Sequence, residues 1–341
     1  MTISFMAQEV AEIPEAAARF LSLSRPAVLA AATALRERDP HLIVTVARGS
    51  SDHVATYLKY CIELAAGVPV ASVGPSIASI YGASLRLQGA ACIGISQSGR
   101  SPDIVEMMRS AGASGAMTIA ITNFADAPMA AVSDHCLALQ AGVEQSVAAT
   151  KTFVTSAVAG LSLLAEWRQD AGLQTAVASL PDAFDRALHL DWSPLAARLA
   201  HAQSLYVLGR GPAFAIANEA ALKFKETCGL HAEAYSAAEV LHGPAAIVQA
   251  GFPVFALGID DAALPQLVST AERLAGQGAD VFLTGAAAKG ATTLPSVPGL
   301  HPLVAPLALI VGFYGFIETL ARRRGFDPDT PPHLRKVTET L

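Results

Sequence analysis

The sequence predicts an α/β protein made of two tandem, doubly wound parallel-sheet domains flanked by helices. Short β-branched runs alternate with helical segments through both halves of the chain, the pattern of a parallel sheet covered on both faces. The length of 341 residues is sufficient for two domains that each bury a core. Arg48-Gly49 is echoed by Arg210-Gly211, 162 residues later (210 minus 48), which indicates that the two halves repeat one fold.

The composition limits the classes of partner. Hydrophobic residues make up 52% of the chain and charged residues 15%, so we expect a second domain or subunit to cover part of the surface. The net charge is −6 without a basic cluster, which argues against a nucleic-acid partner. The four cysteines form no C-x-x-C pair, so neither a disulfide framework nor a zinc site is indicated.

The sequence also argues against a membrane partner. The first twenty residues carry three glutamates and lack a basic start, so they are not typical of a signal peptide. The apolar run at 303–313 is too short to span a bilayer. We therefore expect a cytoplasmic protein.

The first half is expected to begin with one or two amphipathic helices between Met6 and Arg38. A helix from Asp52 to Ala66, ended by Gly67, is expected after the first strand. The expected strands are 43–47, 69–73, 91–95, 117–121 and 135–139. Because the turns after parallel strands meet at one edge of a sheet, side chains in those turns are candidates for a ligand site.

A run of small hydroxyl residues follows the strand at 91–95. Ser101-Pro102 is typical of an N-cap followed by proline at the first helical position. Ser96, Gln97, Ser98 and Ser101 thus line a turn beside the N–H groups of a helix start, which favours an anion such as phosphate. A turn that binds nothing is an equally good interpretation of the spacing alone. Ser51, in the turn after 43–47, either reaches the same ligand or only caps its own helix.

The remaining segments of interest lie between the two halves and in the second. A loop at 142–153 enters a helix that ends near Trp167, and Lys151 is interpreted as a structural lysine. The polar stretch at 173–192 is expected to hold the domain connection and one helix. Shifting Ser96 by 162 residues gives Gly258, which Asp260 and Asp261 follow. Carboxylates repel phosphate, so a phosphate site is predicted in the first half only.

Three charged residues share one face of the helix expected from Pro212 to Gly229. They are Glu219, Lys223 and Glu226, spaced by four and three residues. Such a stripe is most often a solvated surface held by side-chain pairing, and a catalytic cluster is the alternative. Nearby, Ser236 and Glu239 fit a capping box, and His242 follows at a helix end, where an imidazole can face a cleft.

These motifs make the chain similar to the sugar isomerase (SIS) domain family, and in particular to the isomerase domain of glucosamine-6-phosphate synthases, over nearly its whole length. The motifs are Ser96-Gln97-Ser98-Gly99 with Ser101, the charged helix Glu219 to Glu226, and Glu239 to Pro244. The resemblance implies two flavodoxin-like (SIS) domains and a phosphosugar ligand. It also implies that the phosphate lies on the loop of Ser96, Gln97, Ser98 and Ser101, with Ser51 in contact.

The resemblance further implies residue roles. Glu226 is expected to move a proton between sugar carbons one and two, His242 to open the ring, and Lys223 to hold a sugar oxygen. Sugar contacts are expected from Val147, Ala149 and Glu219, although Ala149 stands where the synthases carry serine and so loses a hydroxyl contact. Lys336, in the tail, is expected to form a Schiff base with the open-chain ketose or to contact the ring oxygen. Arg335 departs from the family alanine.

We expect residues 1–170 to hold the first domain, 171–330 the second, and the proline-containing tail 331–341 to lie over the active site. Sequence of the sugar domain begins near Leu42, so no room for a glutaminase domain is expected, and a form without one is better suited to release ammonia than to fix it. The sequence therefore favours a homodimeric glucosamine-6-phosphate deaminase with shared active sites, needing no cofactor and no metal. The alternatives are a fructosamine-phosphate deglycase or aldose–ketose isomerase, and a sugar-phosphate sensor without activity.

Overall fold

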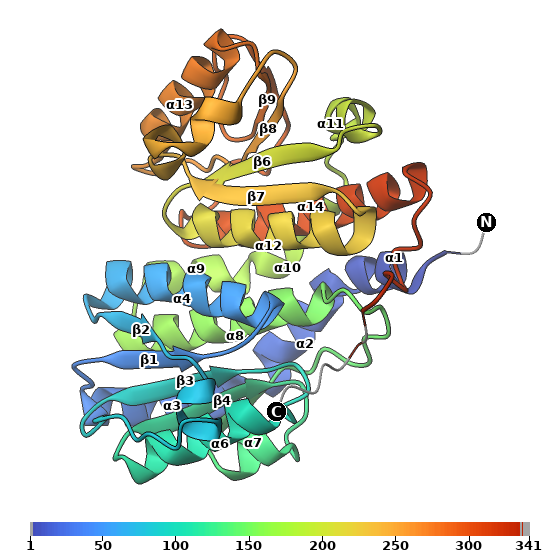
Figure 1. Cartoon of the computed structure of the whole chain (residues 1–341). Coiled ribbons are helices and arrows are strands. Elements are labelled where there is room, and N and C mark those ends of the chain that lie inside the picture. Colours follow the sequence, from blue (N-terminus) through green and yellow to red (C-terminus); the bar gives the residue numbers. More distant parts are fainter. Residues whose placement is uncertain (1–2, 335, 337–341) are drawn as a thin grey trace. The chain divides into compact units, whose positions relative to one another are not determined.

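The computed structural model describes residues 3–334 and Lys336 (Figure 1). The chain forms two compact units, each containing one sheet, and each is described by itself. The N-terminal unit contains residues 12–144, 151–181 and Lys336. The C-terminal unit contains residues 3–11, 145–150 and 182–334.

The N-terminal unit is built on a five-stranded parallel sheet in the order β2-β1-β3-β4-β5. Its strands are β1 Ile43–Val46, β2 Val70–Ser72, β3 Ala91–Ile95, β4 Met117–Thr122 and β5 His135–Ala138. All five expected strands are therefore confirmed, and no strand end is shifted by more than one residue. The strand order reverses between β1 and β3, so the turns after these two strands border the crevice where such sheets bind ligands.

Helices cover both faces of this sheet (Figure 1). They are α2 Ile13–Leu23, α3 Arg25–Arg38, α4 Ser50–Ala66, α5 Ser76–Ser79, α6 Pro102–Ala113, α7 Pro128–Ala131, α8 Lys151–Arg168 and α9 Ala171–Ala178. On one face α8 packs against α2, α3 and α4 and is buried over nearly its whole length, as a central helix must be. On the other face α6 buries Met107 and Met108 against the sheet.

The segment before Arg38 holds three helices where one or two were expected, because α1 Phe5–Ala11 and α2 are separate from α3. Pro14 and Pro26 lie in the first turns of α2 and α3. Proline is accepted there and not inside a helix, so each marks a new start. The polar stretch at 173–192 likewise holds parts of two helices, α9 and α10 Leu180–Leu188, rather than one.

The C-terminal unit repeats the same sheet order. Its strands are β6 Ser204–Gly209, β7 His231–Ser236, β8 Pro253–Ala256, β9 Asp280–Leu283 and β10 Ala291–Thr293, arranged β10-β9-β8-β6-β7. Counted from β6, this is again the order 2-1-3-4-5. The other elements are α11 Ser193–Leu199, α12 Pro212–Cys228, η1 Glu239–His242, η2 Pro244–Ile247, α13 Leu264–Gly276 and α14 Ala305–Arg323.

The repeat extends to backbone angles. Helices α4 and α12 begin and end 162 residues apart, at 50 and 212 and at 66 and 228. Gly49 precedes α4 with φ 54° and ψ −134°, and Gly211 precedes α12 with φ 58° and ψ −137°. Gly67 and Gly229 end them in the left-handed conformation. The predicted internal repeat is thus confirmed at the level of single residues.

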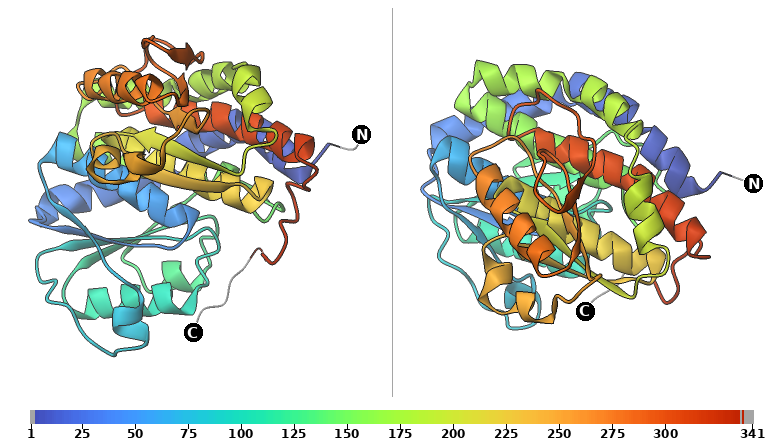
Figure 2. Two further views of the ribbon diagram at one scale, coloured as in Figure 1. Left: turned by 45° about the horizontal axis from the view of Figure 1, so that its top comes forward. Right: turned by 90° about the horizontal axis from the view of Figure 1, so that it is seen from above.

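Helix α14 is the core helix of the C-terminal unit. Figure 2 shows it in red along α12 in yellow, and the two helices pack against each other. It is the one helix in the described part of the chain that is long and apolar enough to cross a membrane, but 78% of that stretch is buried within the protein. The aromatic rings of Phe224 and Phe313 meet edge to face between the two helices, with centroids 5.2 Å apart.

Candidate active site

The predicted phosphate loop lies between β3 and α6, at the crevice of the N-terminal unit. Ser96 Oγ accepts a hydrogen bond from the N–H of Gly99 at 3.2 Å, and Ser98 Oγ accepts one from Arg100 at 3.3 Å. A hydroxyl that accepts in this way keeps its own hydrogen for donation. Ser101 occupies the N-cap of α6, as predicted, yet its side chain makes no capping bond in the part of the chain that the structure describes. The loop therefore places hydroxyl donors at the positive end of a helix.

The end of β4 fixes this loop. The carbonyl oxygen of Gln97 accepts hydrogen bonds from Thr122 Oγ1 at 3.2 Å and from the N–H of Asn123 at 3.1 Å. Gly99 has φ +61°, and a Cβ there would lie 2.7 Å from both Thr122 Oγ1 and Ala127 Cβ. Glycine is thus required at this position, both for the backbone angle and for the close approach to β4.

The neighbouring turn, after β1, carries Ser51 in the first turn of α4. Arg48 links this turn to helix α6, because its Nε lies 2.5 Å from Oδ2 of Asp103 in the first turn of that helix. Asp103 is buried, while the Arg48 side chain is 44% exposed. Sequence reasoning missed this pair. An acid in the first turn of a helix is a local signal, but nothing local connects it to an arginine 55 residues earlier.

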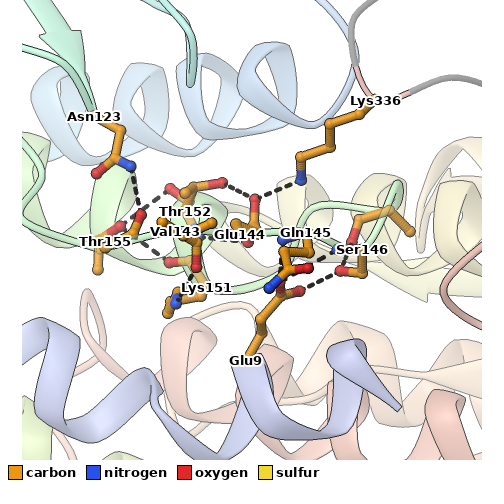
Figure 3. A network of polar contacts seen from close by, with 12 residues as sticks. Glu9, Asn123, Val143, Glu144, Gln145, Ser146, Lys151, Thr152, Thr155 and Lys336 are labelled. Carbon is orange, nitrogen blue, oxygen red and sulfur yellow. Dashed lines mark hydrogen bonds and ion pairs between the residues drawn. The ribbon is translucent and has the colours of Figure 1, made fainter.

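Lys336 also belongs to the N-terminal unit. Its Nζ lies 3.1 Å from Oε2 of Glu144, whose side chain is fully buried (Figure 3). Glu144 also accepts hydrogen bonds from the N–H and Oγ1 of Thr152, at 3.0 and 2.6 Å. The ammonium is therefore held at the start of α8 rather than solvated on a free tail. Of the predicted tail 331–341, the structure describes 331–334 and Lys336, so Arg335 lies outside the described residues.

Lys151 fits its interpretation as a structural lysine. It is buried at the start of α8, where its Nζ donates to the carbonyl oxygen of Val143 at 2.8 Å and pairs with Glu12 at 2.5 Å. Its ammonium therefore ties the loop before α8 to the segment before α2.

The charged stripe of α12 is buried in the C-terminal unit, so the solvated-surface interpretation is wrong. Lys223 Nζ lies 3.0 Å from Glu219 Oε1 and 2.7 Å from Glu226 Oε2. The side chains of Glu219 and Lys223 are fully buried, whereas that of Glu226 is 21% exposed. Tyr314 of α14 donates from its hydroxyl to Glu219 Oε1 at 3.1 Å. Glu226 is therefore the member of the cluster that solvent, and hence a ligand, can reach.

The protonation state of this cluster follows from its charges. Burial by itself lowers the pKa of the Lys223 ammonium, but the carboxylates of Glu219 and Glu226 outweigh burial and hold that pKa above its ordinary value. Lys223 thus remains a cation at neutral pH. It cannot act as a proton acceptor.

His242 lies on a separate segment of the C-terminal unit, exposed at the end of the single 3-10 turn η1. The loop is held by Tyr206, whose hydroxyl donates to the carbonyl oxygen of Pro244 at 2.9 Å. The capping box predicted from Ser236 to Glu239 is wrong, because Ala238 is the N-cap and no side chain in the described structure caps this turn. Ser236 is instead the last residue of β7, and its hydroxyl accepts a hydrogen bond from Arg210 at 3.3 Å.

Val147 and Ala149 lie in the segment 145–150 of the C-terminal unit. The N–H of Val147 donates to the carbonyl oxygen of Asp329 at 3.1 Å, so this amide is engaged within the protein. The same segment is anchored by Glu9, a buried residue of α1 whose carboxylate accepts hydrogen bonds from Gln145 and Ser146. Sequence reasoning did not identify Glu9, because its partners are distant in the chain.

The second sheet presents a different chemistry at the matching edge. A cavity of about 310 Å³ lies after β8 and β9, lined by Gly258 and Asp260 and by the first residues of α14. Asp261 follows, and burial raises the pKa of its carboxyl group. At the positions that match Ser96 and Ser98 the chain carries Gly258 and Asp260, and Ser296 is the one serine among the residues that line this cavity.

The structure thus brings the predicted residues together in two groups. Ser51, Ser96, Gln97, Ser98 and Ser101, together with Lys336, belong to the N-terminal unit, and the first five lie in the turns after β1 and β3. Glu219, Lys223 and Glu226 form one hydrogen-bonded cluster in the C-terminal unit, which also holds His242, Val147 and Ala149.

Comparison with known proteins places these features in a family. The family model described as "SIS domain" matches residues 35–165 and 198–285, more than half of the chain. The glutamine–fructose-6-phosphate aminotransferase (isomerizing) of Pyrobaculum aerophilum is 32% identical, with the alignment covering 98% of this chain and 57% of that protein. The chain therefore spans little more than half the length of this relative.

Many solved structures match nearly the whole chain, among them the following two. The C-terminal domain of glucosamine-fructose-6-phosphate aminotransferase from Francisella tularensis is 26% identical, with a TM-score of 0.85 over 96% of this chain and 99% of that one. A protein from Silicibacter pomeroyi, provisionally assigned as a phosphosugar isomerase, is 53% identical, with a TM-score of 0.93 over 96% of this chain and 100% of that one. Sequence, sheet order and family match agree, and the chain belongs to the SIS domain family.

Proposed function

We propose that the chain is a phosphosugar isomerase that converts glucosamine 6-phosphate to fructose 6-phosphate and ammonia. The observation that carries this proposal is the cluster on α12. There the buried Lys223, which is a cation at neutral pH, pairs with the partly exposed carboxylate of Glu226. Proton transfer between two sugar carbons needs one such carboxylate, placed to take a proton and return it. The similarity to a protein provisionally assigned as a phosphosugar isomerase and to the C-terminal domain of an aminotransferase that acts on fructose 6-phosphate supports this class of reaction.

Each group has a role in the proposed reaction. The serine hydroxyls of the loop after β3 bind the phosphate, and His242 protonates the ring oxygen to open the sugar. Glu226 then takes the proton from carbon two and delivers it to carbon one, which turns the amino aldose into an imine at carbon two. Water adds to this imine, and ammonia leaves to give the ketose. Lys223 holds Glu226 in place through their ion pair.

Further parts of the proposal concern assembly and location. Because His242 is exposed on its turn, we also propose a homodimer in which the imidazole of one chain completes the site of the other. The four cysteines are free thiols, which suits a cytoplasmic protein.

The test is an ammonia assay on the purified protein with glucosamine 6-phosphate, and with unphosphorylated glucosamine as the control. Ammonia and fructose 6-phosphate should appear together from the phosphorylated sugar only. Interconversion of phosphosugars without ammonia would instead indicate a plain aldose–ketose isomerase. Ammonia-free release of an amino acid from a glycated, phosphorylated amine would indicate a deglycase. Binding without any turnover would leave the chain as a sensor.

A further inference from the structure

Glu144 is a buried carboxylate with a fixed position. It follows β5 and therefore lies at the same carboxyl edge of the first sheet as the loop after β3. The N–H and hydroxyl of Thr152, in the first turn of α8, donate to its two oxygens. A carboxylate at the start of an 18-residue helix is stabilised by the helix dipole and by these charge-assisted bonds.

The pair with Lys336 differs from the neighbouring pair of Lys151. In the Lys151–Glu12 pair the lysine is 1% exposed and the carboxylate 51%, so the cation is the fixed member. In the Lys336–Glu144 pair the carboxylate is fully buried and the lysine is 26% exposed. The anion is therefore the fixed member of the pair, and the partly exposed lysine is the member that a ligand can reach.

We propose that Glu144 is a positioning residue for Lys336, which holds the ammonium at the carboxyl edge of the first sheet and exchanges a proton with it during the reaction. This inference rests on the proposed function and adds one step to it, in which the amine of Lys336 forms a Schiff base with carbon two of the open-chain phosphoketose, as the resemblance implies for this lysine. Glu144 itself does not touch the sugar.

The proton balance defines what Glu144 does. The Lys336 ammonium passes one proton to Glu144 Oε2, and the freed nitrogen lone pair forms a bond to carbon two of the ketose while the carbonyl π electrons move to oxygen. A proton moves from that nitrogen to the oxygen, which gives a hydroxyl. Glu144 returns its proton to the hydroxyl, which leaves as water, and a protonated Schiff base remains. One ketone and one ammonium give one iminium and one water, so no other reactant is needed.

The first experiment does not depend on activity. Without sugar, the acetylation of Lys336 by acetic anhydride is followed by mass spectrometry in the wild type, in Glu144→Gln and in Glu12→Gln. Loss of the carboxylate should raise the acetylation rate of Lys336 several-fold in Glu144→Gln and leave it unchanged in Glu12→Gln. An unchanged rate in Glu144→Gln would overturn the proposal even if the protein proves to be an isomerase.

The second experiment is a double-mutant cycle of Glu144 and Lys336. Two quantities are measured in each variant: kcat, and the rate at which cyanoborohydride traps fructose 6-phosphate on the protein. Glu144→Gln keeps an oxygen for the Thr152 N–H, so the start of α8 is preserved, while kcat and the trapping rate should fall tenfold or more with KM within twofold. In a Lys336→Ala background the same substitution should have no further effect. An equal loss of kcat in both backgrounds would mean that Glu144 acts only on the fold. Glu144→Asp, which keeps the charge, should recover part of the rate and also serves if the glutamine variant folds poorly.

Discussion

At the scale of the residue, the decisive feature is the burial of charge on α12. Lys223 is fully buried between two carboxylates, and Glu219 is satisfied on its other side by Tyr314. A buried ion pair costs much desolvation free energy, so it is weak evidence for stability, but removal of one partner leaves an uncompensated charge.

Lys223→Met should therefore lower the free energy of unfolding by about 3–5 kcal/mol. The matched control is Arg109→Met, which removes a cation from the exposed pair with Glu106 and should cost less than about 1 kcal/mol. Urea denaturation of both variants measures the difference. Equal losses for the two would show that the α12 cluster is no different from a surface pair.

The pH dependence of the stability lost in Lys223→Met follows from the raised pKa of Lys223. A group whose folded pKa exceeds its unfolded value contributes stability below the unfolded pKa, here near 10.5, and loses it as pH rises through the folded pKa. The stability difference between wild type and Lys223→Met should thus be constant from neutral pH to mildly alkaline pH. A difference that shrinks already near pH 8 would contradict the raised pKa.

Glu226→Gln tests the chemical role of the exposed member of the cluster. The amide keeps the size of the side chain but cannot accept the proton, so kcat should fall by about 10²–10⁴. Exchange of the carbon-two hydrogen with heavy water should fall in parallel, because it reports the same abstraction. Binding of the phosphosugar should persist, since the proposed phosphate contacts lie in the other half of the sequence. Near-normal turnover and exchange would remove Glu226 from the reaction.

At the scale of the element, the loop after β3 depends on one backbone position. Gly99→Ala and Gly82→Ala both place alanine at a φ near +60°, which costs about 1–2 kcal/mol, but only at Gly99 does the Cβ meet neighbouring atoms. Gly99→Ala should therefore cost about 1–3 kcal/mol more than Gly82→Ala and weaken phosphosugar binding, because the loop must move away from β4. Thermal unfolding and substrate titration of the pair decide this. Equal stability of the two variants would mean that the loop yields freely.

The elements also show how far the sequence alone leads. The strands, α12 and the internal repeat were predictable because their signals are periodic or local, as with Gly67 and Gly229 at helix ends. The capping box failed because Ser236 was needed as the last residue of a strand, where tertiary pairing overrides a local motif. The partners of the candidate site, such as Tyr314 on Glu219, carry no local signal at all, because only the fold brings α14 to α12.

At the scale of the whole molecule, the proposed dimer makes a prediction about mixtures. Glu226→Gln and His242→Asn are each expected to be inactive as pure proteins. If His242 serves the site of a second chain, subunit exchange between the two variants should restore part of the activity, since some sites then hold both intact residues. Activity of mixed samples, with exchange verified by mass spectrometry, measures this. The absence of recovery after verified exchange would assign both residues to one chain.

Because the backbone angles at Gly49 and Gly211 match, the two halves of the chain can be compared directly with each other. The same backbone geometry occurs beside two different sheet edges of one polypeptide. The edge of the first sheet carries serine hydroxyls, and the edge of the second carries Asp260 and Asp261. Calorimetric titration with fructose 6-phosphate should therefore give a stoichiometry of one ligand per chain. A stoichiometry of two would mean that the shared geometry of the peptide backbone, and not the serine side chains, selects the anion.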